Sequence, residues 1–240
     1  MEKILLIIPA YNEEKSILNT VNSIYDYNKK NKTNFDIIVI NDGSIDLTEK
    51  ILCDNNIPHI KLIHNLGIGG AVQTGYKYAL ENNYDIAIQF DADGQHDINS
   101  IENLIDPIVN KEANMVIGSR FVKKDSSEFK STFARVIGIR IISFFMKLFT
   151  RKKIYDVTSG YRASDKKTIE HFSHTYPIEY PEPVSTVDLI KNKFKIKEVP
   201  VNMVERKGGT SSIHSWKKAY YMVNVILSMF VLWLRGERHE

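Results

Sequence analysis

The sequence predicts an α/β fold in which a mostly parallel sheet is flanked by helices. Short apolar runs alternate with segments of helical periodicity through the first half of the chain, and polar clusters follow several of those runs. Repeated strand–helix units favour a parallel sheet with helices on both faces. The composition agrees, because 240 residues that are 43% hydrophobic and 25% charged are typical of one large globular domain.

Five apolar runs in the first half are typical of buried strands. They are Ile4–Ile8, Asp36–Ile40, Lys61–His64, Ile86–Phe90 and Met115–Gly118. We expect Asn12 to cap the helix after the first run, with Glu13 and Glu14 in its first turn, where carboxylates suit the helix dipole. Further helices are predicted from about Thr48, from Ala71 to about Asn82 and over Ile98–Val109.

The second half is less regular and contains two long apolar helical candidates, Phe129–Thr150 and Ser215–Leu234. The first carries basic residues beside large aromatics, so it either lies in a membrane interface or packs in the core with a basic outer face. The second is either buried or against lipid. Neither reaches the roughly 18–20 uninterrupted apolar residues of a membrane span. Between them we expect helices at Lys166–Phe172 and Thr186–Lys193, a strand at Lys195–Val199 and a loop exposing Glu179 and Glu182 among three prolines.

The stretch Asp91-Ala92-Asp93-Gly94-Gln95 directly follows the fourth predicted strand. Residues two apart on an extended chain face the same side, so Asp91 and Asp93 can aim their carboxylates at one point, with Gln95 continuing the row. An oxygen-only cluster suits Mg²⁺ or Mn²⁺ together with substrate phosphates. A solvated acidic turn is the alternative for an isolated pair of this kind.

Other polar clusters also follow predicted strands, namely Asn12–Glu14, Asn41–Asp42 and Ser119–Arg120. Ligands of open parallel sheets bind outside the carboxyl ends of the strands, so the spacing gathers these clusters into one crevice. A net charge of +3 does not indicate nucleic acid and is compatible with an anionic substrate or a membrane. The single cysteine, Cys53, excludes an intrachain disulfide, and cytosolic residence is the simplest expectation.

In this order, the clusters resemble a family 2 glycosyltransferase of the GT-A type, in particular the branch of dolichol-phosphate mannose synthase and the bacterial polyprenyl-phosphate glycosyltransferases. The matching stretches are Ile8-Pro9-Ala10-Tyr11-Asn12-Glu13-Glu14, Asn41-Asp42-Gly43-Ser44, Asn65-Leu66-Gly67-Ile68-Gly69-Gly70-Ala71, Asp91-Ala92-Asp93-Gly94-Gln95-His96, Gly118-Ser119-Arg120-Phe121, Ser159-Gly160-Tyr161-Arg162 and Glu205–Ser212. The resemblance implies one GT-A domain over 1–240, with a nucleotide-sugar half (1–122) and an acceptor- or membrane-facing half (123–240).

The resemblance also implies roles for matching residues. Those implied to hold the nucleotide-sugar are Pro9, Tyr11, Glu13, Ile40, Asp42, Asp91 and Ala92. The implied ligands of Mg²⁺ or Mn²⁺ on the diphosphate are Asp91, Asp93 and Gln95, while Arg120 and Arg206 would face phosphate, a bidentate task that favours Arg.

Arg135 is implied to bind the acceptor, although this branch has Ser four residues later, where the present chain has Ile139. We expect the run Gly67–Gly70 to let backbone approach the nucleotide. His96 and His214 are expected at the surface; a C-terminal histidine completes the metal shell in some members of the wider family.

The resemblance implies an inverting sugar transfer from a nucleotide-sugar to a polyprenyl phosphate at the cytoplasmic membrane face. The protein would be peripheral to the membrane, with a possible membrane-protein partner or homo-oligomer. An alternative acceptor is a hydroxyl of a lipid-linked, cell-wall or capsular glycan. That reaction needs a general base, for which Glu182, Glu179 and Asp156 are candidates.

Two other classes of protein would also bind a nucleotide or a lipid. A sugar-phosphate nucleotidyltransferase should carry a glycine-rich loop with Arg after the first strand, where this chain has Pro9-Ala10-Tyr11-Asn12. A non-catalytic nucleotide- or lipid-binding module needs no intact acidic pair.

Overall fold

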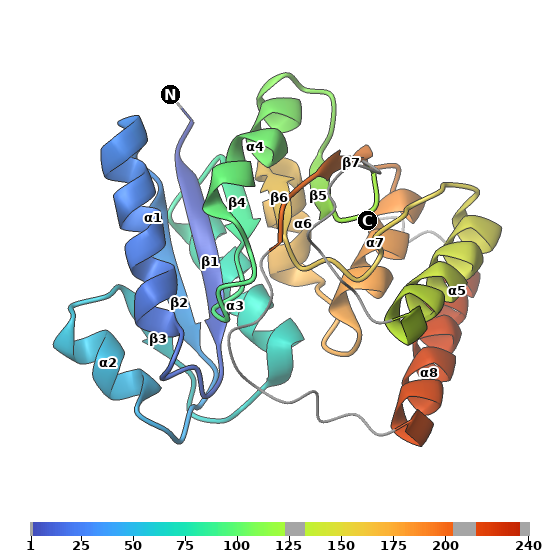
Figure 1. The fold of residues 1–240 in the computed structure, drawn as a ribbon. Helices are drawn as coiled ribbons and strands as arrows, with labels where there is room; N and C mark the ends of the chain where they lie inside the picture. The colour runs from blue at the N-terminus through green and yellow to red at the C-terminus, as the bar shows by residue number, and fades with distance from the viewer. Residues whose placement is uncertain (1, 123–132, 204–214, 236–240) are drawn as a thin grey trace.

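The computed structural model describes residues 2–122, 133–203 and 215–235 (Figure 1). In these residues a seven-stranded sheet has the order β3-β2-β1-β4-β6-β5-β7. The strands are β1 (Ile4–Ala10), β2 (Asp36–Asn41), β3 (His59–Lys61), β4 (Ile86–Gln89), β5 (Met115–Ser119), β6 (Arg162–Asp165) and β7 (Ile196–Pro200). The sheet therefore joins strands from both halves of the chain, and the predicted α/β class is confirmed.

The helices cover both faces of this sheet. They are α1 (Ile17–Asn31), α2 (Thr48–Asp54), α3 (Gly67–Glu81), the short 3₁₀ helix η1 (Ile98–Ser100), α4 (Ile101–Val109), α5 (Phe133–Thr150), α6 (Lys166–His174), α7 (Pro181–Lys191) and α8 (Ser215–Leu234). One apolar core lies between the sheet and α1 and α4, and a second lies between the sheet and α3, α6 and α7. Every residue of β1 is buried, as expected for a strand covered on both faces.

The departure from a parallel sheet is β6, which pairs antiparallel with both β4 and β5. Its sequence, Arg162-Ala163-Ser164-Asp165, lacks the apolar run that marks a buried strand, so the sequence did not predict it. Arg162 and Ser164 are nevertheless buried with partners; Ser164 lies 3.0 Å from the Tyr76 hydroxyl. β6 brings the second half of the chain into the middle of the sheet.

The first helix begins later than predicted, at Ile17. Asn12 does not cap it: its backbone is left-handed (φ 55°), and its side-chain oxygen accepts from the Ile45 N–H. The Glu14 carboxylate likewise accepts from the Leu47 N–H. The segment after β1 is therefore an irregular loop tied to the loop after β2.

The glycine run is helical, because α3 starts at Gly67. A Cβ on Gly69 would lie 2.4 Å from the carbonyl oxygens of Pro177 and Ile178. This glycine therefore permits close packing of α3 on the segment before α7. The expected approach of backbone to a nucleotide stays a prediction for this run, from which Ile68 lines the cavity described below.

The prediction that Glu182 is exposed in a loop among prolines is wrong, because Glu182 is helical. Helix α7 starts at Pro181, where proline is well tolerated because the first helical N–H has no partner within the helix. Glu182 follows in the first turn, where the helix dipole suits a carboxylate. The helix therefore fixes the direction of this side chain.

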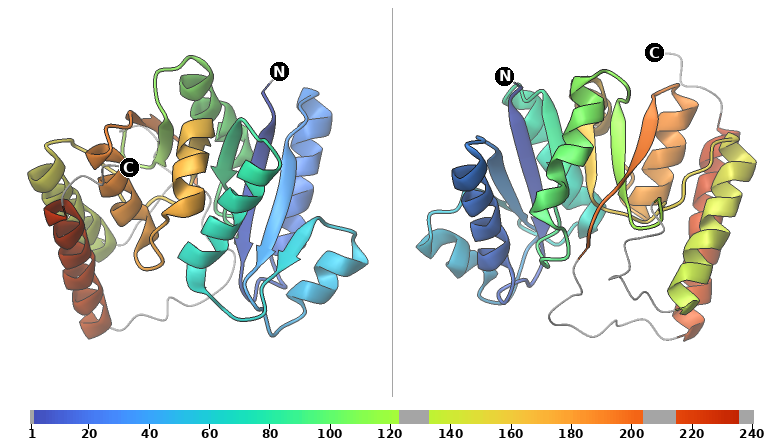
Figure 2. Two further views of the ribbon diagram at one scale, coloured as in Figure 1. Left: turned by 180° about the vertical axis from the view of Figure 1, so that it is seen from behind. Right: turned by 45° about the horizontal axis from the view of Figure 1, so that its top comes forward.

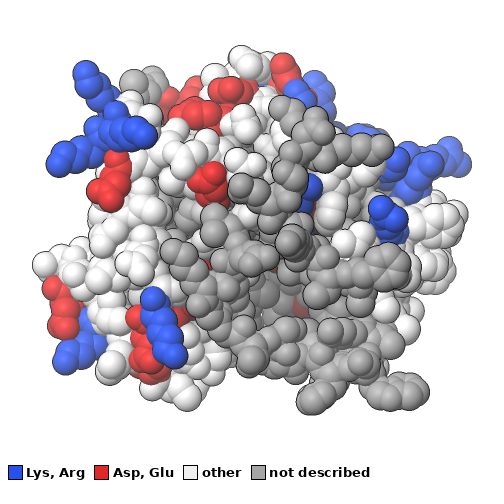
Figure 3. All heavy atoms as spheres, viewed as in Figure 1, with Lys and Arg blue, Asp and Glu red and all other residues white. Residues whose placement is uncertain are grey.

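Helices α5 and α8 pack against one another and α7 at one end of the molecule (Figure 2). Apolar side chains remain exposed along α5, at Ile137, Ile141, Phe144 and Leu148, and along α8, at Tyr220, Val223, Leu227, Phe230, Val231, Trp233 and Leu234. We call these residues the apolar end surface. Figure 3 shows Lys and Arg side chains gathered at the edge near the end of α5, where Lys147, Arg151, Lys152 and Lys153 are exposed. Within the described ranges, none of the helices combines the length and apolarity that crossing a membrane requires.

Candidate active site

A cavity of about 310 Å³ opens where β1, β2 and β4 end. Its walls come from both halves of the chain. The lining residues are Pro9, Ala10, Tyr11, Glu13, Asp42, Ile68, Ala71, Asp91, Ala92, Asp93, Thr158, Gly160, Glu182 and Tyr221. The crevice predicted from the polar clusters is thus present at the carboxyl ends of parallel strands.

Asp91 and Asp93 line this cavity together, and both are partly exposed to it. Asp93 Oδ1 accepts from the Gln95 N–H at 3.0 Å, and Gly94 between them has the left-handed φ of 74° that this tight turn needs. Gln95 therefore contributes a backbone donor to Asp93, whereas its side chain is not among those lining the cavity. Two neighbouring carboxylates facing one cavity fit a hard divalent cation.

His96 is buried, contrary to the expected surface position. Its ring stacks on Tyr161, with centroids 4.5 Å apart, and meets the edge of Phe90. Nδ1 accepts from the Asp91 N–H at 3.0 Å, and Nε2 lies 3.4 Å from Asp91 Oδ2. Burial lowers the pKa of His96 from 6.5 to about 4; the Asp93 charge opposes this and the Arg120 charge adds to it. A neutral imidazole therefore holds Asp91 in place.

The second half of the chain supplies the floor of the cavity. A Cβ on Gly160 would lie 2.9 Å from Gln89 Nε2 and 3.1 Å from Asp91 Oδ2, so only glycine lets the loop before β6 pass the acidic pair. Arg162, two residues on, is buried and donates to carbonyl and hydroxyl oxygens, including those of Ser159 and Ser185. A cationic guanidinium is thus fixed beneath the cavity.

Glu182 faces the cavity from the first turn of α7. Burial raises the pKa of its carboxyl above the ordinary value, the Arg162 guanidinium lowers it, and the Asp91 carboxylate raises it. Burial outweighs the cation, so the net direction is upward. Of the three candidate bases, Glu179 is exposed and does not line the cavity, and Asp156 is fully buried in an ion pair.

Most of the residues expected to bind the nucleotide line this cavity. Asp42 is buried, and its Oδ1 accepts from the Leu66 N–H at 2.7 Å. The Glu13 carboxylate accepts from the Ser16 hydroxyl, while Tyr11 is 46% exposed. The exception is Ile40: its fully buried side chain packs in the core below the cavity and does not line it.

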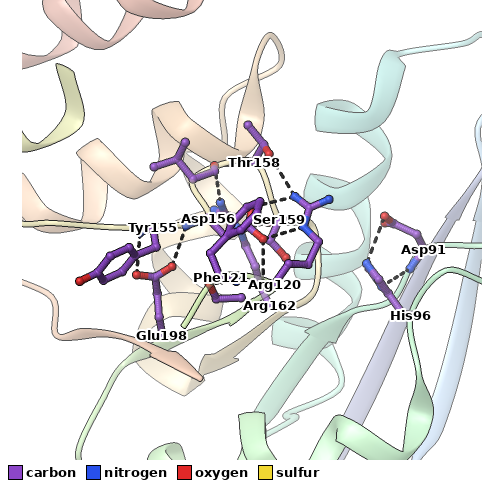
Figure 4. A network of polar contacts seen from close by, with 12 residues as sticks. Asp91, His96, Arg120, Phe121, Tyr155, Asp156, Thr158, Ser159, Arg162 and Glu198 are labelled. Atoms are coloured by element: carbon purple, nitrogen blue, oxygen red, sulfur yellow. Dashed lines mark hydrogen bonds and ion pairs between the residues drawn. The ribbon is translucent and has the colours of Figure 1, made fainter. Parts of the chain in front are cut away.

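Arg120 is placed differently from the expectation that its planar fork faces phosphate (Figure 4). Its Nε and Nη2 each donate to an oxygen of Asp156 at 2.7 Å, and both residues are buried. The Tyr155 and Asp156 N–H groups donate in turn to the Glu198 carboxylate. The Arg120 fork therefore anchors the loop that carries Thr158 and Gly160 into the cavity.

Three residues singled out in the sequence cannot be placed. Arg206 and His214 lie outside the described residues, and Arg135 lies in α5 with a side chain that is not described. Conversely, the sequence assigned no role to Thr158, Gly160, Arg162 or Tyr221. Only the Ser159-Gly160-Tyr161-Arg162 stretch carried a signal, through its match to the family; Tyr221 lies on a helix whose apolar pattern indicated packing.

A larger cavity of about 960 Å³ lies between α6, α7 and the end of α8. It contains a close pair of His171 Nε2 and Asp188 Oδ2, 2.5 Å apart, and Lys191, whose Nζ donates to the Leu232 carbonyl at the end of α8. None of the clusters at the strand ends opens into it. The polar strand ends, and not cavity size, therefore identify the candidate active site.

The fold places the chain in the GT-A class, with its cavity at the carboxyl ends of parallel strands. A solved structure of glucosyl-3-phosphoglycerate synthase from Mycobacterium tuberculosis, in complex with Mn²⁺, UDP and phosphoglyceric acid, has the same fold with a TM-score of 0.68 and 16% identity, over 99% of this chain and 80% of that one. The chain belongs to glycosyl transferase family 2, whose model matches residues 5–172. It is a glycosyltransferase, and the nucleotidyltransferase alternative is set aside.

Two curated relatives extend over nearly the whole chain. The UDP-N-acetylglucosamine--dolichyl-phosphate N-acetylglucosaminyltransferase of Methanococcus voltae is 38% identical over 221 residues, covering 84% of this chain and 85% of its own length. The undecaprenyl-phosphate mannosyltransferase of Micrococcus luteus is 29% identical over 235 residues, covering 93% and 92%. Both relatives are named for polyprenyl-phosphate acceptors.

Proposed function

We propose that this glycosyltransferase moves a sugar from a nucleotide-sugar to a polyprenyl phosphate, with inversion at the anomeric carbon, at the cytoplasmic face of a membrane. The observation that carries the proposal is the cavity in which Asp42, after β2, meets Asp91 and Asp93, after β4. The names of the two relatives support the lipid-phosphate acceptor.

The donor would lie along the wall formed by the loops after β1 and β2. Asp42 and Glu13 would accept from base or ribose donors, and Tyr11 and Pro9 would flank the base. Asp42 is fixed by its bond from the Leu66 N–H, so its carboxylate needs little reordering on binding. Ala92, buried between the two aspartates, would keep the backbone close to the diphosphate.

The carboxylates of Asp91 and Asp93 fit Mg²⁺ or Mn²⁺, and Mn²⁺ is present with UDP in the structural neighbour. Such a cation, when bound, would supply positive charge where the departing diphosphate gains negative charge. His96 and the Gln95 N–H orient the two carboxylates, and Gly160 leaves room beside them.

The acceptor decides what Glu182 does. A polyprenyl phosphate is already anionic and needs no base, whereas a hydroxyl needs one within hydrogen-bond reach. Glu182 lies in the cavity with a raised pKa, which favours a second candidate function, transfer to a glycan hydroxyl. Glu182→Gln separates the two, because it should leave transfer to polyprenyl phosphate within about threefold of wild type and reduce transfer to a hydroxyl by about 10²-fold or more.

Arg206 and Arg135 stay predictions for phosphate handling. Arg206→Ala should reduce transfer more than Arg206→Lys, because lysine keeps the charge but loses the planar fork. Equal losses in the two variants would contradict a bidentate role.

The apolar end surface is the proposed membrane contact. It combines exposed aromatics such as Phe144 and Trp233 with neighbouring basic side chains, a pattern that suits the interface of an anionic bilayer. The chain should float with anionic vesicles, and Phe144→Ser with Leu148→Ser should sediment. The matched control is Ile63→Ser, since Ile63 is 91% exposed but belongs to the loop after β3; if it abolished flotation equally, the proposed surface would be wrong.

The direct test is a screen of nucleotide-sugars with Mn²⁺, with and without a short-chain polyprenyl phosphate, read by the mass of the lipid product. We expect a glycosylated lipid phosphate from wild type and none from Asp93→Ala. Asp106→Ala is the control, because Asp106 is exposed on α4 away from the cavity. If glycan hydroxyls accelerate donor hydrolysis and lipid phosphate does not, the second candidate function, transfer to a glycan hydroxyl, is favoured.

A further inference from the structure

Helix α2 lies beside β3, the outermost strand of the sheet (Figure 1). Three side chains with different metal-binding atoms converge there. They are Glu49 and Cys53 of α2 and His59 of β3, and their ligand atoms all lie within 4.8 Å of one another. A metal ion could be held by a group of three or more His, Cys, Asp or Glu side chains, and among the described residues this trio forms such a group. None of them lines the cavity that contains Asp91 and Asp93.

The local structure explains why they meet. Glu49 and Cys53 are four residues apart on α2, so they share one face of the helix. That face meets His59, the first residue of the outermost strand β3. His59 Nδ1 lies 2.8 Å from the Ile57 carbonyl oxygen, to which its N–H can donate. This bond fixes the tautomer and turns the lone pair of Nε2 toward the other two ligands, as is usual for metal-binding histidines.

The spacing is close to that of a tetrahedral zinc site. With ordinary bond lengths to zinc, a histidine nitrogen and a carboxylate oxygen should be about 3.4 Å apart, and a sulfur and a nitrogen about 3.6 Å apart. His59 Nε2 lies 3.6 Å from Glu49 Oε1 and 3.9 Å from Cys53 Sγ. The Lys61 ammonium, also 3.6 Å from Glu49 Oε1, is half-exposed and can turn outward into solvent.

We propose that Glu49, Cys53 and His59 form a zinc site separate from the active site. Thiolate and imidazole ligands select Zn²⁺ over Mg²⁺, whereas the oxygen-only pair of Asp91 and Asp93 has the opposite preference. The cation would replace the thiol proton of Cys53, which passes to solvent, and water would take the fourth position.

The site would tie the sheet edge to the wall of the active site. The Asn41 side-chain amide donates to Glu49 Oε2, and Asn41 directly precedes Asp42 in the cavity wall. Zinc bound to the folded chain would therefore raise thermal stability by mass action. At a free zinc concentration about a hundredfold above Kd, the expected rise in Tm is about 5–10 °C for a chain of this size.

Cobalt titration of the purified full chain tests the proposal, because Co²⁺ bound to thiolate gives a near-ultraviolet charge-transfer band that carboxylate sites do not give. We expect the band at one equivalent in wild type and in Asp93→Ala, and its loss in Cys53→Ser and His59→Ala. His64→Ala is the matched control and should keep the band, since His64 is exposed five residues beyond His59.

Zinc should raise the Tm of wild type and of His64→Ala, but not that of Cys53→Ser. All variants should have the Tm of wild type to within a few degrees in chelator, which separates loss of the site from loss of the fold. Absence of the band in wild type, or its survival in Cys53→Ser or His59→Ala, would overturn the proposal. None of these readouts depends on sugar transfer.

Discussion

Replacing His96 by asparagine tests whether a buried neutral imidazole positions the acidic pair. The folded-state pKa of His96 is about 4 against 6.5 for an ordinary histidine, so the unfolded chain binds the extra proton first as the pH falls. Stability contributed by the neutral ring is therefore fully present above pH 6.5 and is lost between pH 6.5 and about pH 4. One pH unit is worth about 1.4 kcal/mol, so the loss is about 2 kcal/mol between pH 7 and pH 5 and about 3 kcal/mol over the whole window.

Urea unfolding at pH 7 and pH 5 measures this loss directly. His96→Asn keeps an oxygen that can accept from the Asp91 N–H but removes the titrating group. Its stability should fall by about 2 kcal/mol less than that of wild type between the two pH values. His64→Asn, which removes an exposed histidine, should follow wild type. Parallel pH dependences for wild type and His96→Asn would refute the reasoning.

Three further substitutions test the site. Glu182→Gln should raise the Tm at pH 7.5, because the raised pKa of Glu182 means that its ionised form opposes folding at neutral pH; a lower Tm would contradict this. Gly160→Ala should reduce sugar transfer by about 10–10²-fold, because the new Cβ would lie 3.1 Å from the Asp91 carboxylate. Gly138→Ala on α5 is the control and should keep activity within about twofold, because its Cβ would lie 3.4 Å from the nearest atom, the Met222 sulfur. Arg120→Ala should destabilise the fold by about 3–5 kcal/mol in urea unfolding, because it leaves the fully buried Asp156 carboxylate unpaired; a loss below 1 kcal/mol would rule out this structural role.

The sequence was sufficient for the parts of the fold that periodicity encodes. Four apolar runs of the first half became β1, β2, β4 and β5 because each forms a largely buried segment, and Ser215–Leu234 became α8 with the predicted bounds. The third strand was misplaced: β3 covers His59–Lys61, shares only Lys61 with the predicted Lys61–His64, and is not buried. β6 was missed because it buries polar residues whose partners, such as Tyr76 for Ser164, are distant in the chain. The start of α1 was misplaced because Asn12 bonds across to the next loop and not along its own helix.

The candidate site was predictable where one strand end determines it, as for Asp91 and Asp93. It was not predictable where long-range pairing decides the outcome. Arg120 directly follows β5 and is chemically suited to phosphate, yet its fork is paired with Asp156, 36 residues away. His96 looked like a surface residue, but its ring is enclosed by Phe90 and Tyr161.

The most direct test of the central claim, that Asp91 and Asp93 hold the diphosphate of a nucleotide-sugar through a divalent cation, is nucleotide binding by calorimetry. UDP and GDP should each be titrated into wild type, Asp93→Ala and Asp106→Ala, with Mn²⁺ and with chelator. We expect at least one nucleotide to bind to wild type and to Asp106→Ala in Mn²⁺, and binding to weaken at least tenfold in chelator or in Asp93→Ala. Equal affinity in all six combinations of protein and metal condition would contradict that claim.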